Sequence, residues 1–224
     1  MKKHIILLLL SVMVIACGKD TDQNDATPPE GAVNLGLSVY WATCNLGAAD
    51  PVEYGDYYAW GEVEPKSEYS WENYRFREDG NTEADIIVSK YNSLDIHGAV
   101  DGKTVLEPED DAAHMRLGGK WRIPTIVEFQ ELIDSCEWTW TNKRGVLGYN
   151  VESKVNGKSI FLPSTGYYFQ KGLHGEEFGG YYWMSGTHAT TSGKAQRLFF
   201  TPNKKLVSIY YRCLGQPIRP VSEK

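Results

Sequence analysis

Six aromatic residues between positions 57 and 74 are the side chains of this chain best suited to contact a ligand. They lie among glycines and polar residues, and they are Tyr57, Tyr58, Trp60, Tyr69, Trp71 and Tyr74. Exposed rings at these positions would stack on sugar rings or pack against a protein partner. The alternative is that they fold a long surface segment back onto its domain. We take them as the candidate ligand-binding residues and leave that alternative open.

A group of acidic residues follows this segment, at Glu107, Glu109, Asp110 and Asp111. Carboxylate oxygens are ligands that Ca²⁺ prefers, so a calcium site is one interpretation. The other is that Asp110 or Asp111 caps a helix that begins directly after it. We favour the cap and predict no metal or cofactor.

The sequence lacks the spacings that define common catalytic sites. Its five histidines are scattered, with no pair four residues apart, and neither a Gly-x-Ser-x-Gly motif nor a phosphate-binding glycine loop occurs. We therefore assign no catalytic residue and favour a binding protein over an enzyme.

Cys17 follows a short apolar run, residues 5–15, which is preceded by Lys2 and Lys3. The run is too short to span a bilayer and has the proportions of a signal peptide. The sequence Val-Ile-Ala-Cys that ends at Cys17 resembles a bacterial lipoprotein signal, in which the peptide is cut before the cysteine and the cysteine is acylated. The resemblance implies a signal peptide over 1–16 and anchorage in the lipid bilayer through Cys17.

Residues 17–32 are polar and contain a proline pair, which predicts a flexible tether between the lipid anchor and a single domain over residues 33–222. The acidic residues after Cys17 are similar to the surface-export signals of some Gram-negative lipoproteins, while an ordinary solvated linker is the alternative. We expect a location at the outer membrane, facing the cell surface.

Charge excludes one class of partner. The chain carries 23 basic and 29 acidic residues, and removal of Lys2 and Lys3 with the signal peptide leaves a formal charge of −8. Binding to nucleic acid calls for a basic surface, so we predict no nucleic-acid partner.

Three cysteines remain once Cys17 is acylated: Cys44, Cys136 and Cys213. An extracytoplasmic location permits one disulfide among them and one free thiol. The alternative is three buried thiols that pack as small apolar groups.

Two helices are predicted between the acidic group and position 135. A short one runs through Met115 and ends at Gly118. A longer one spans about 125–135, because Thr125 and Glu128 have the spacing of a capping box and apolar residues follow at helical intervals.

Most of the remaining chain is predicted to form strands. Residues 33–41 alternate between apolar and polar types, and 196–211 contain a hairpin pattern. Asn-Gly at 156–157 predicts a type I′ hairpin turn. Residues 64–108 are predicted to form a long surface excursion with a short strand near 86–91.

Several segments occur in an order that points to a known family. They are Leu-Gly-Leu-Ser-Val at 35–39, Trp-Ala-Thr-Cys-Asn-Leu-Gly-Ala at 41–48, Tyr-Gly-Asp-Tyr-Tyr-Ala-Trp-Gly-Glu at 54–62, Trp-Arg-Ile-Pro-Thr at 121–125, Tyr-Trp at 182–183 and Ile-Arg-Pro-Val at 218–221. This order resembles the Fibrobacter succinogenes major paralogous domain family of surface lipoproteins. The family has no established activity to transfer.

The segment from Asp111 to Phe129 is distantly similar to the formylglycine-generating sulfatase-modifying enzymes, which have a C-type-lectin-like fold. The similarity implies an α+β domain with two helices, twisted antiparallel sheets, a long loop insertion and adjacent termini. Those enzymes bind a metal through paired cysteines near the C-terminus, whereas Cys213 stands alone here, so we do not expect their activity.

These features together predict a non-catalytic binding module for a surface glycan or protein. An enzyme that acts on surface polymers and a structural subunit of a surface assembly are the alternatives. With both termini near the membrane, the segments 64–108 and 172–180 would face outward.

Overall fold

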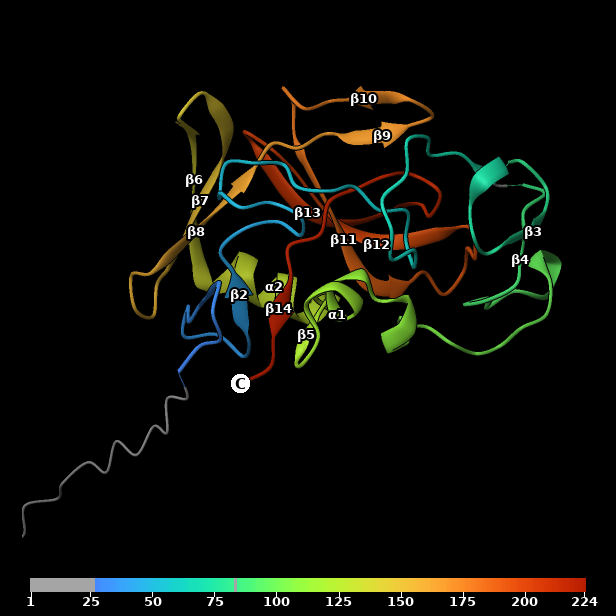
Figure 1. The fold of residues 1–224 in the computed structure, drawn as a ribbon, viewed down its shortest axis with the longest axis horizontal. Helices are drawn as coiled ribbons and strands as arrows, with labels where there is room; N and C mark the ends of the chain where they lie inside the picture. Colours follow the sequence, from blue (N-terminus) through green and yellow to red (C-terminus); the bar gives the residue numbers. More distant parts are fainter. Residues whose placement is uncertain (1–26, 83) are drawn as a thin grey trace, which may run out of the picture.

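The computed structural model describes residues 27–82 and 84–224. These residues form short helices and several small antiparallel sheets, so the predicted α+β class is confirmed (Figure 1). The predicted signal peptide and the predicted acylation of Cys17 lie outside the described residues. Within those two ranges, no helix is both long and apolar enough to cross a bilayer.

A four-stranded antiparallel sheet joins the beginning of the described chain to its end, in the order β1-β2-β14-β5. Its strands are β1 (Ala32–Val33), β2 (Tyr40–Ala42), β14 (Val221–Ser222) and β5 (Trp121–Arg122). Trp41 lies opposite Val33 on one side and opposite Val221 on the other. The two ends of the domain therefore lie side by side.

The apolar alternation over residues 33–41 predicts one continuous strand, and this prediction is wrong. Only the two ends of the segment pair, in β1 and β2. Between them Gly36 has a φ of +75°, and its N–H donates to the Asn34 side chain at 2.9 Å, so the chain turns. Leu35 and Leu37 are nevertheless buried. The alternation marks buried positions, because burial rather than strand pairing selects apolar residues here.

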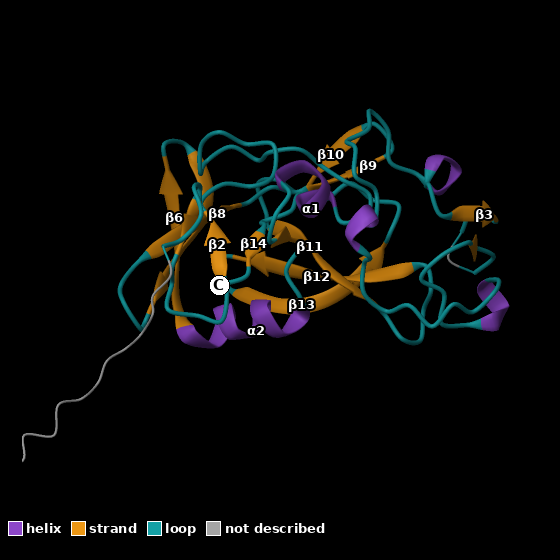
Figure 2. Cartoon of the chain, turned by 60° about the horizontal axis from the view of Figure 1, so that its bottom comes forward, coloured by secondary structure: helices purple, strands orange, loops and turns teal. Residues whose placement is uncertain are grey.

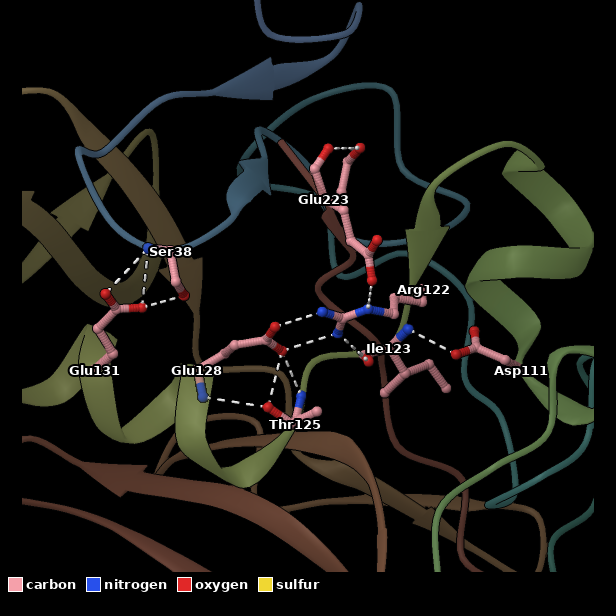
Figure 3. Close-up of polar contacts among 9 residues, drawn as sticks. Ser38, Asp111, Arg122, Ile123, Thr125, Glu128, Glu131 and Glu223 are labelled. Carbon is pink, nitrogen blue, oxygen red and sulfur yellow. Dashed lines mark hydrogen bonds and ion pairs between the residues drawn. The ribbon is translucent and has the colours of Figure 1, made fainter. Parts of the chain in front are cut away.

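Both predicted helices are present, as α1 (Ala112–Leu117) and α2 (Ile126–Ser135). Asp111, not Asp110, caps α1: one carboxylate oxygen accepts the His114 N–H at 3.0 Å. Its other oxygen accepts the Ile123 N–H at 2.8 Å, so one side chain joins α1 to the residue directly after strand β5 (Figure 3). Three short 3₁₀ helices complete the helical structure of the described residues: η1 (Trp71–Asn73), η2 (Asp95–His97) and η3 (Pro108–Asp110).

Helix α2 begins at the predicted capping box. The Glu128 N–H donates to the Thr125 hydroxyl at 3.3 Å, and the Thr125 N–H donates to the Glu128 carboxylate at 2.7 Å. These two bonds satisfy N–H groups that the first turn of a helix leaves without partners.

Antiparallel hairpins make up most of the remaining structure, as the β pattern after position 136 predicts. Two three-stranded sheets consist of β6 (Cys136–Lys143), β7 (Val146–Ser153) and β8 (Ser159–Pro163), and of β11 (Gly180–Thr187), β12 (Lys194–Thr201) and β13 (Lys204–Tyr211). Two smaller hairpins pair β3 (Arg77–Asp79) with β4 (Ile87–Val88), and β9 (Tyr167–Phe169) with β10 (Gly172–His174).

The type I′ turn lies one hairpin earlier than predicted. Such a turn needs positive φ at both central residues, and between β6 and β7 Arg144 and Gly145 have φ values of 52° and 90°. Of the predicted pair, only Gly157 has positive φ. The Asn156 amide instead donates to the Asn34 carbonyl at 2.9 Å, so a contact with the N-terminal segment shapes that loop.

The sheet β11-β12-β13 separates two apolar cores, and its strand β11 is buried on both faces. Alternation along β11 directs Tyr182 and Met184 into one core and Trp183 into the other. Helix α2 packs beneath this sheet, beside β13 (Figure 2). The second core lies under the segment 64–108, which extends to one end of the molecule (Figure 1).

Two fully buried arginines hold the irregular segments together. Arg212 donates to the carbonyls of Lys90 and Tyr91 at 3.2 and 2.6 Å, and its guanidinium lies 4.7 Å from the Trp60 ring centroid. Arg219 donates to the Phe161 carbonyl at 2.9 Å. Buried carbonyls need hydrogen-bond donors. Arg212 supplies them to the loop residues Lys90 and Tyr91, and Arg219 supplies one to a carbonyl of strand β8.

Candidate functional site

All six candidate ligand-binding aromatics are buried, with exposed fractions from 0% for Tyr58 to 8% for Trp71. The Tyr74 hydroxyl donates to the Trp60 carbonyl at 2.8 Å, and the Trp60 indole donates to the Met184 carbonyl at 2.8 Å. The prediction that these rings offer a stacking surface is therefore wrong. The alternative is what the structure shows, because the rings fold the segment onto the domain.

A groove of about 450 Å³ opens beside this buried cluster. Its lining comes from four separate parts of the chain: η1 with its flanking residues, the turn between β3 and β4, strand β9 with the tip of its hairpin, and the end of β13 with the residues after it. These parts contribute Glu68, Ser70, Trp71, Glu72, Asn81, Thr82, Tyr167, Phe169, Gln170, Tyr210, Tyr211, Cys213 and Leu214. The volume lies within the range of small-molecule sites.

Backbone hydrogen bonds fix the hairpin that forms one wall of the groove. Gln170 donates to the Tyr69 carbonyl at 2.7 Å and accepts the Tyr69 N–H at 2.9 Å. Tyr168 exchanges a similar pair of bonds with Gly215, at 2.8 and 3.0 Å. A Cβ at Gly215 would lie 2.9 Å from the Tyr69 ring, so the close approach requires glycine at this position.

Aromatic rings dominate the walls. Trp71 is the one candidate from the sequence that reaches the groove, and its ring centroid lies 6.4 Å from that of Tyr211. Tyr210 lies beside Tyr211 at 5.0 Å, and Phe169 is 45% exposed at the hairpin tip. The sequence analysis did not select these three residues or Tyr167, because no local pattern brings their segments together with η1.

A buried cation supports the aromatic wall from behind. The Arg197 guanidinium lies 4.0 Å from the Tyr210 ring centroid and 5.0 Å from that of Tyr181. Burial lowers the pKa of Arg197 to about 10, and its Nε donates to the Ser208 hydroxyl at 3.1 Å. Stacking on a guanidinium restrains the Tyr210 ring, which helps to preorganise the groove.

The polar lining is acidic or neutral. Glu72 is exposed and Glu68 half-buried, while Asn81 and Thr82 stand on a turn whose N–H groups donate to Asp85. The thirteen lining residues include no lysine, arginine or histidine. The groove thus combines apolar rings with carboxylates.

The acidic group at 107–111 is an ion-pair network in the structure. Lys90 Nζ lies 2.6 Å from a Glu107 oxygen and 2.5 Å from an Asp110 oxygen, and Lys103 Nζ lies 2.8 Å from Glu107. Hydrogen bonds from Lys103 and then Lys90 lower the pKa of Glu107 to about 2. Oxygens of Glu107, Glu109 and Asp110 lie within 4.8 Å of one another, and the Lys90 ammonium lies among them, so calcium binding here stays an alternative to the ion pairs.

The three cysteines of the described residues are free thiols, so of the two alternatives the structure shows thiols and not a disulfide. Cys136 belongs to the core around α2 and Cys213 to the core on the other side of the central sheet, while Cys44 is half-buried. Burial raises the pKa of Cys213 to about 12, so this groove-lining thiol stays protonated and is a poor nucleophile.

Comparison with protein-family models, with curated proteins and with solved structures found no match for this chain. The described residues therefore define its class by geometry: an α+β protein with an aromatic groove that carries two glutamates. The candidate site differs from the predicted one in every residue but Trp71.

Proposed function

We propose that this chain is a lipoprotein of the outer membrane whose C-type-lectin-like domain binds a surface glycan without chemical change. The single observation that carries the glycan assignment is the groove, in which partly exposed rings lie beside carboxylate, amide and hydroxyl groups. Flat apolar rings accept the C–H faces of sugar rings, and the polar groups match sugar hydroxyls.

The arrangement of the domain supports a tethered binding role. The β9-β10 hairpin lies on the side opposite β14 and the C-terminus, and the segment 64–108 extends away from the point where the described chain begins (Figure 1). A chain anchored through Cys17 would then present the groove away from the membrane.

The two alternatives have less support. An enzyme needs titratable groups activated for proton transfer or attack. In the groove, burial raises the pKa of the Cys213 thiol and of the Tyr167 hydroxyl, which keeps both groups protonated and inactive as nucleophiles. A structural subunit would need a large apolar patch, whereas exposed apolar side chains such as Val127, Leu147 and Phe178 belong to separate elements.

Glycan-array binding of the purified acylated chain in detergent micelles tests the proposal. Phe169→Ala removes an exposed groove ring and is expected to weaken glycan binding about fivefold, since one aromatic contact contributes about 1 kcal/mol. Phe178→Ala is the matched control, because Phe178 is 70% exposed but does not line the groove. Absence of binding to any glycan, or equal losses in both variants, would contradict the proposal.

A further inference from the structure

The acidic lining of the groove restricts the class of glycan that it would bind. Resting on the proposed function, we infer that the groove selects glycans whose sugars carry free, positively charged amino groups. The inference uses two features of the lining together: carboxylates without strong cationic partners, and aromatic faces that attract cations.

The two groove carboxylates belong to Glu68 and Glu72. Within the described residues, Glu72 forms no ion pair, and its exposed carboxylate lines the groove. Glu68 has one cationic neighbour, Lys171, whose Nζ lies 3.6 Å away on a side chain that is 79% exposed. An exposed ion pair of this kind contributes little free energy, so the Glu68 carboxylate remains available to a cation on the ligand.

The aromatic walls favour the same charge. Trp71, Tyr167, Phe169, Tyr210 and Tyr211 all line the groove, and the faces of aromatic rings attract cations. Trp71 is only 8% exposed and Tyr210 already stacks on Arg197, so Phe169, which is 45% exposed, is the ring most open to a ligand. Outside the lining, Lys194 Nζ lies 5.1 Å from the Tyr211 centroid, which places an ammonium group near one ring of the wall.

A hexosamine with a free amine satisfies both features at once. Its ring would stack on the aromatic wall, while its ammonium group would pair with Glu68 or Glu72. An acidic or sulfated glycan would bring like charge toward the same carboxylates and would bind less tightly. An N-acetylated sugar keeps the stacking but loses the ion pair.

Isothermal titration of the full acylated chain in micelles tests the inference with three oligosaccharides of equal length: glucosamine, N-acetylglucosamine and glucose oligomers. The glucosamine oligomer, at a pH where its amines are protonated, is expected to bind about tenfold more tightly than the other two, since two exposed ion pairs contribute about threefold each. Higher salt should reduce this difference. The double variant Glu68→Gln with Glu72→Gln should abolish the preference, whereas Glu137→Gln on the exposed strand β6 should preserve it.

Three results would overturn the inference. One is equal binding of charged and neutral oligomers, which would leave glycan binding itself intact. The second is an unchanged preference in the double variant. The third is equally tight binding of an oligolysine of matched charge, which would show that the groove recognises cations without sugars. Failure of all three oligosaccharides to bind would instead contradict the proposed function.

Discussion

Arg122 and Glu128 form a two-point ion pair that joins strand β5 to the first turn of helix α2 (Figure 3). The two guanidinium nitrogens lie 2.9 and 2.5 Å from the two carboxylate oxygens. One of those oxygens also accepts the Thr125 N–H and hydroxyl, at 2.7 and 3.0 Å. Glu128 thus caps its own helix and fixes the sheet that unites the two ends of the domain.

Replacing Glu128 by alanine should therefore lower the free energy of unfolding by about 2 kcal/mol, since it removes a cap and leaves the half-buried Arg122 guanidinium with only its longer ion pair, to Glu223 at 3.4 Å. Urea denaturation measures this loss. Gln130→Ala changes an exposed residue of the same helix and should cost less than about 0.5 kcal/mol. Comparable losses in the two variants would mean that the ion pair contributes nothing specific.

Acid should weaken the same element. Burial raises the pKa of Glu128, but the Arg122 and Thr125 hydrogen bonds outweigh burial and hold the pKa below its usual value. A lowered carboxyl pKa stabilises the fold above the unfolded-state pKa, and this stability is lost as the pH falls through the lowered folded-state pKa. Unfolding free energies measured from neutral to acidic pH should fall more steeply for the natural chain than for Glu128→Gln; parallel curves would refute this.

Arg212→Lys should destabilise the fold by about 3 kcal/mol, because a buried lysine cannot reproduce the forked hydrogen bonds of a guanidinium. Those bonds hold Tyr91, a buried aromatic residue with a φ of 60°, in a backbone conformation that costs energy. Thermal unfolding provides the measurement. Arg144→Lys, at an exposed hairpin turn, should change the midpoint of thermal unfolding little. A similarly small change for Arg212→Lys would mean that the Arg212 hydrogen bonds do not hold Tyr91 in place.

The thiols should differ in reactivity. Burial raises the pKa of Cys136 to about 11 and that of Cys213 to about 12, whereas Cys44 is half-buried. Iodoacetamide should therefore label Cys44 first in the folded protein and the other two only after unfolding. Mass spectrometry of Cys44→Ser should show almost no labelling under native conditions. Labelling that fails to reach all three positions in denaturant without reductant would indicate a disulfide.

Cys17→Ala tests the proposed anchor. We expect the variant to lose incorporation of labelled fatty acid and to leave the membrane fraction, because the thiol is the proposed attachment point. Cys44→Ser serves as the control and should retain both properties. Protease treatment of intact cells then examines surface exposure, and a protected, membrane-bound chain would argue for the inner leaflet.

Local patterns predicted much of the fold. The capping box at Thr125, the cap at Asp111 and the β12-β13 hairpin all occur where the sequence places them. Each of these features depends on residues a few positions apart, so the contacts that stabilise it lie within one short segment. The acylation of Cys17 rests on a local signal too, and stays a prediction.

Contacts between distant segments decided the rest. Whether Tyr69 or Phe169 would be exposed depends on the bonds between the segment 64–108 and the β9-β10 hairpin, a separation of about a hundred residues that no local pattern encodes. The groove itself exists only where η1, the turn between β3 and β4, that hairpin and the end of β13 meet. Composition and spacing thus predicted helices, hairpins and an anchor, because short-range geometry governs these. Packing alone determined which aromatic rings lie in the apolar cores and which line the groove, because burial is a property of the folded chain.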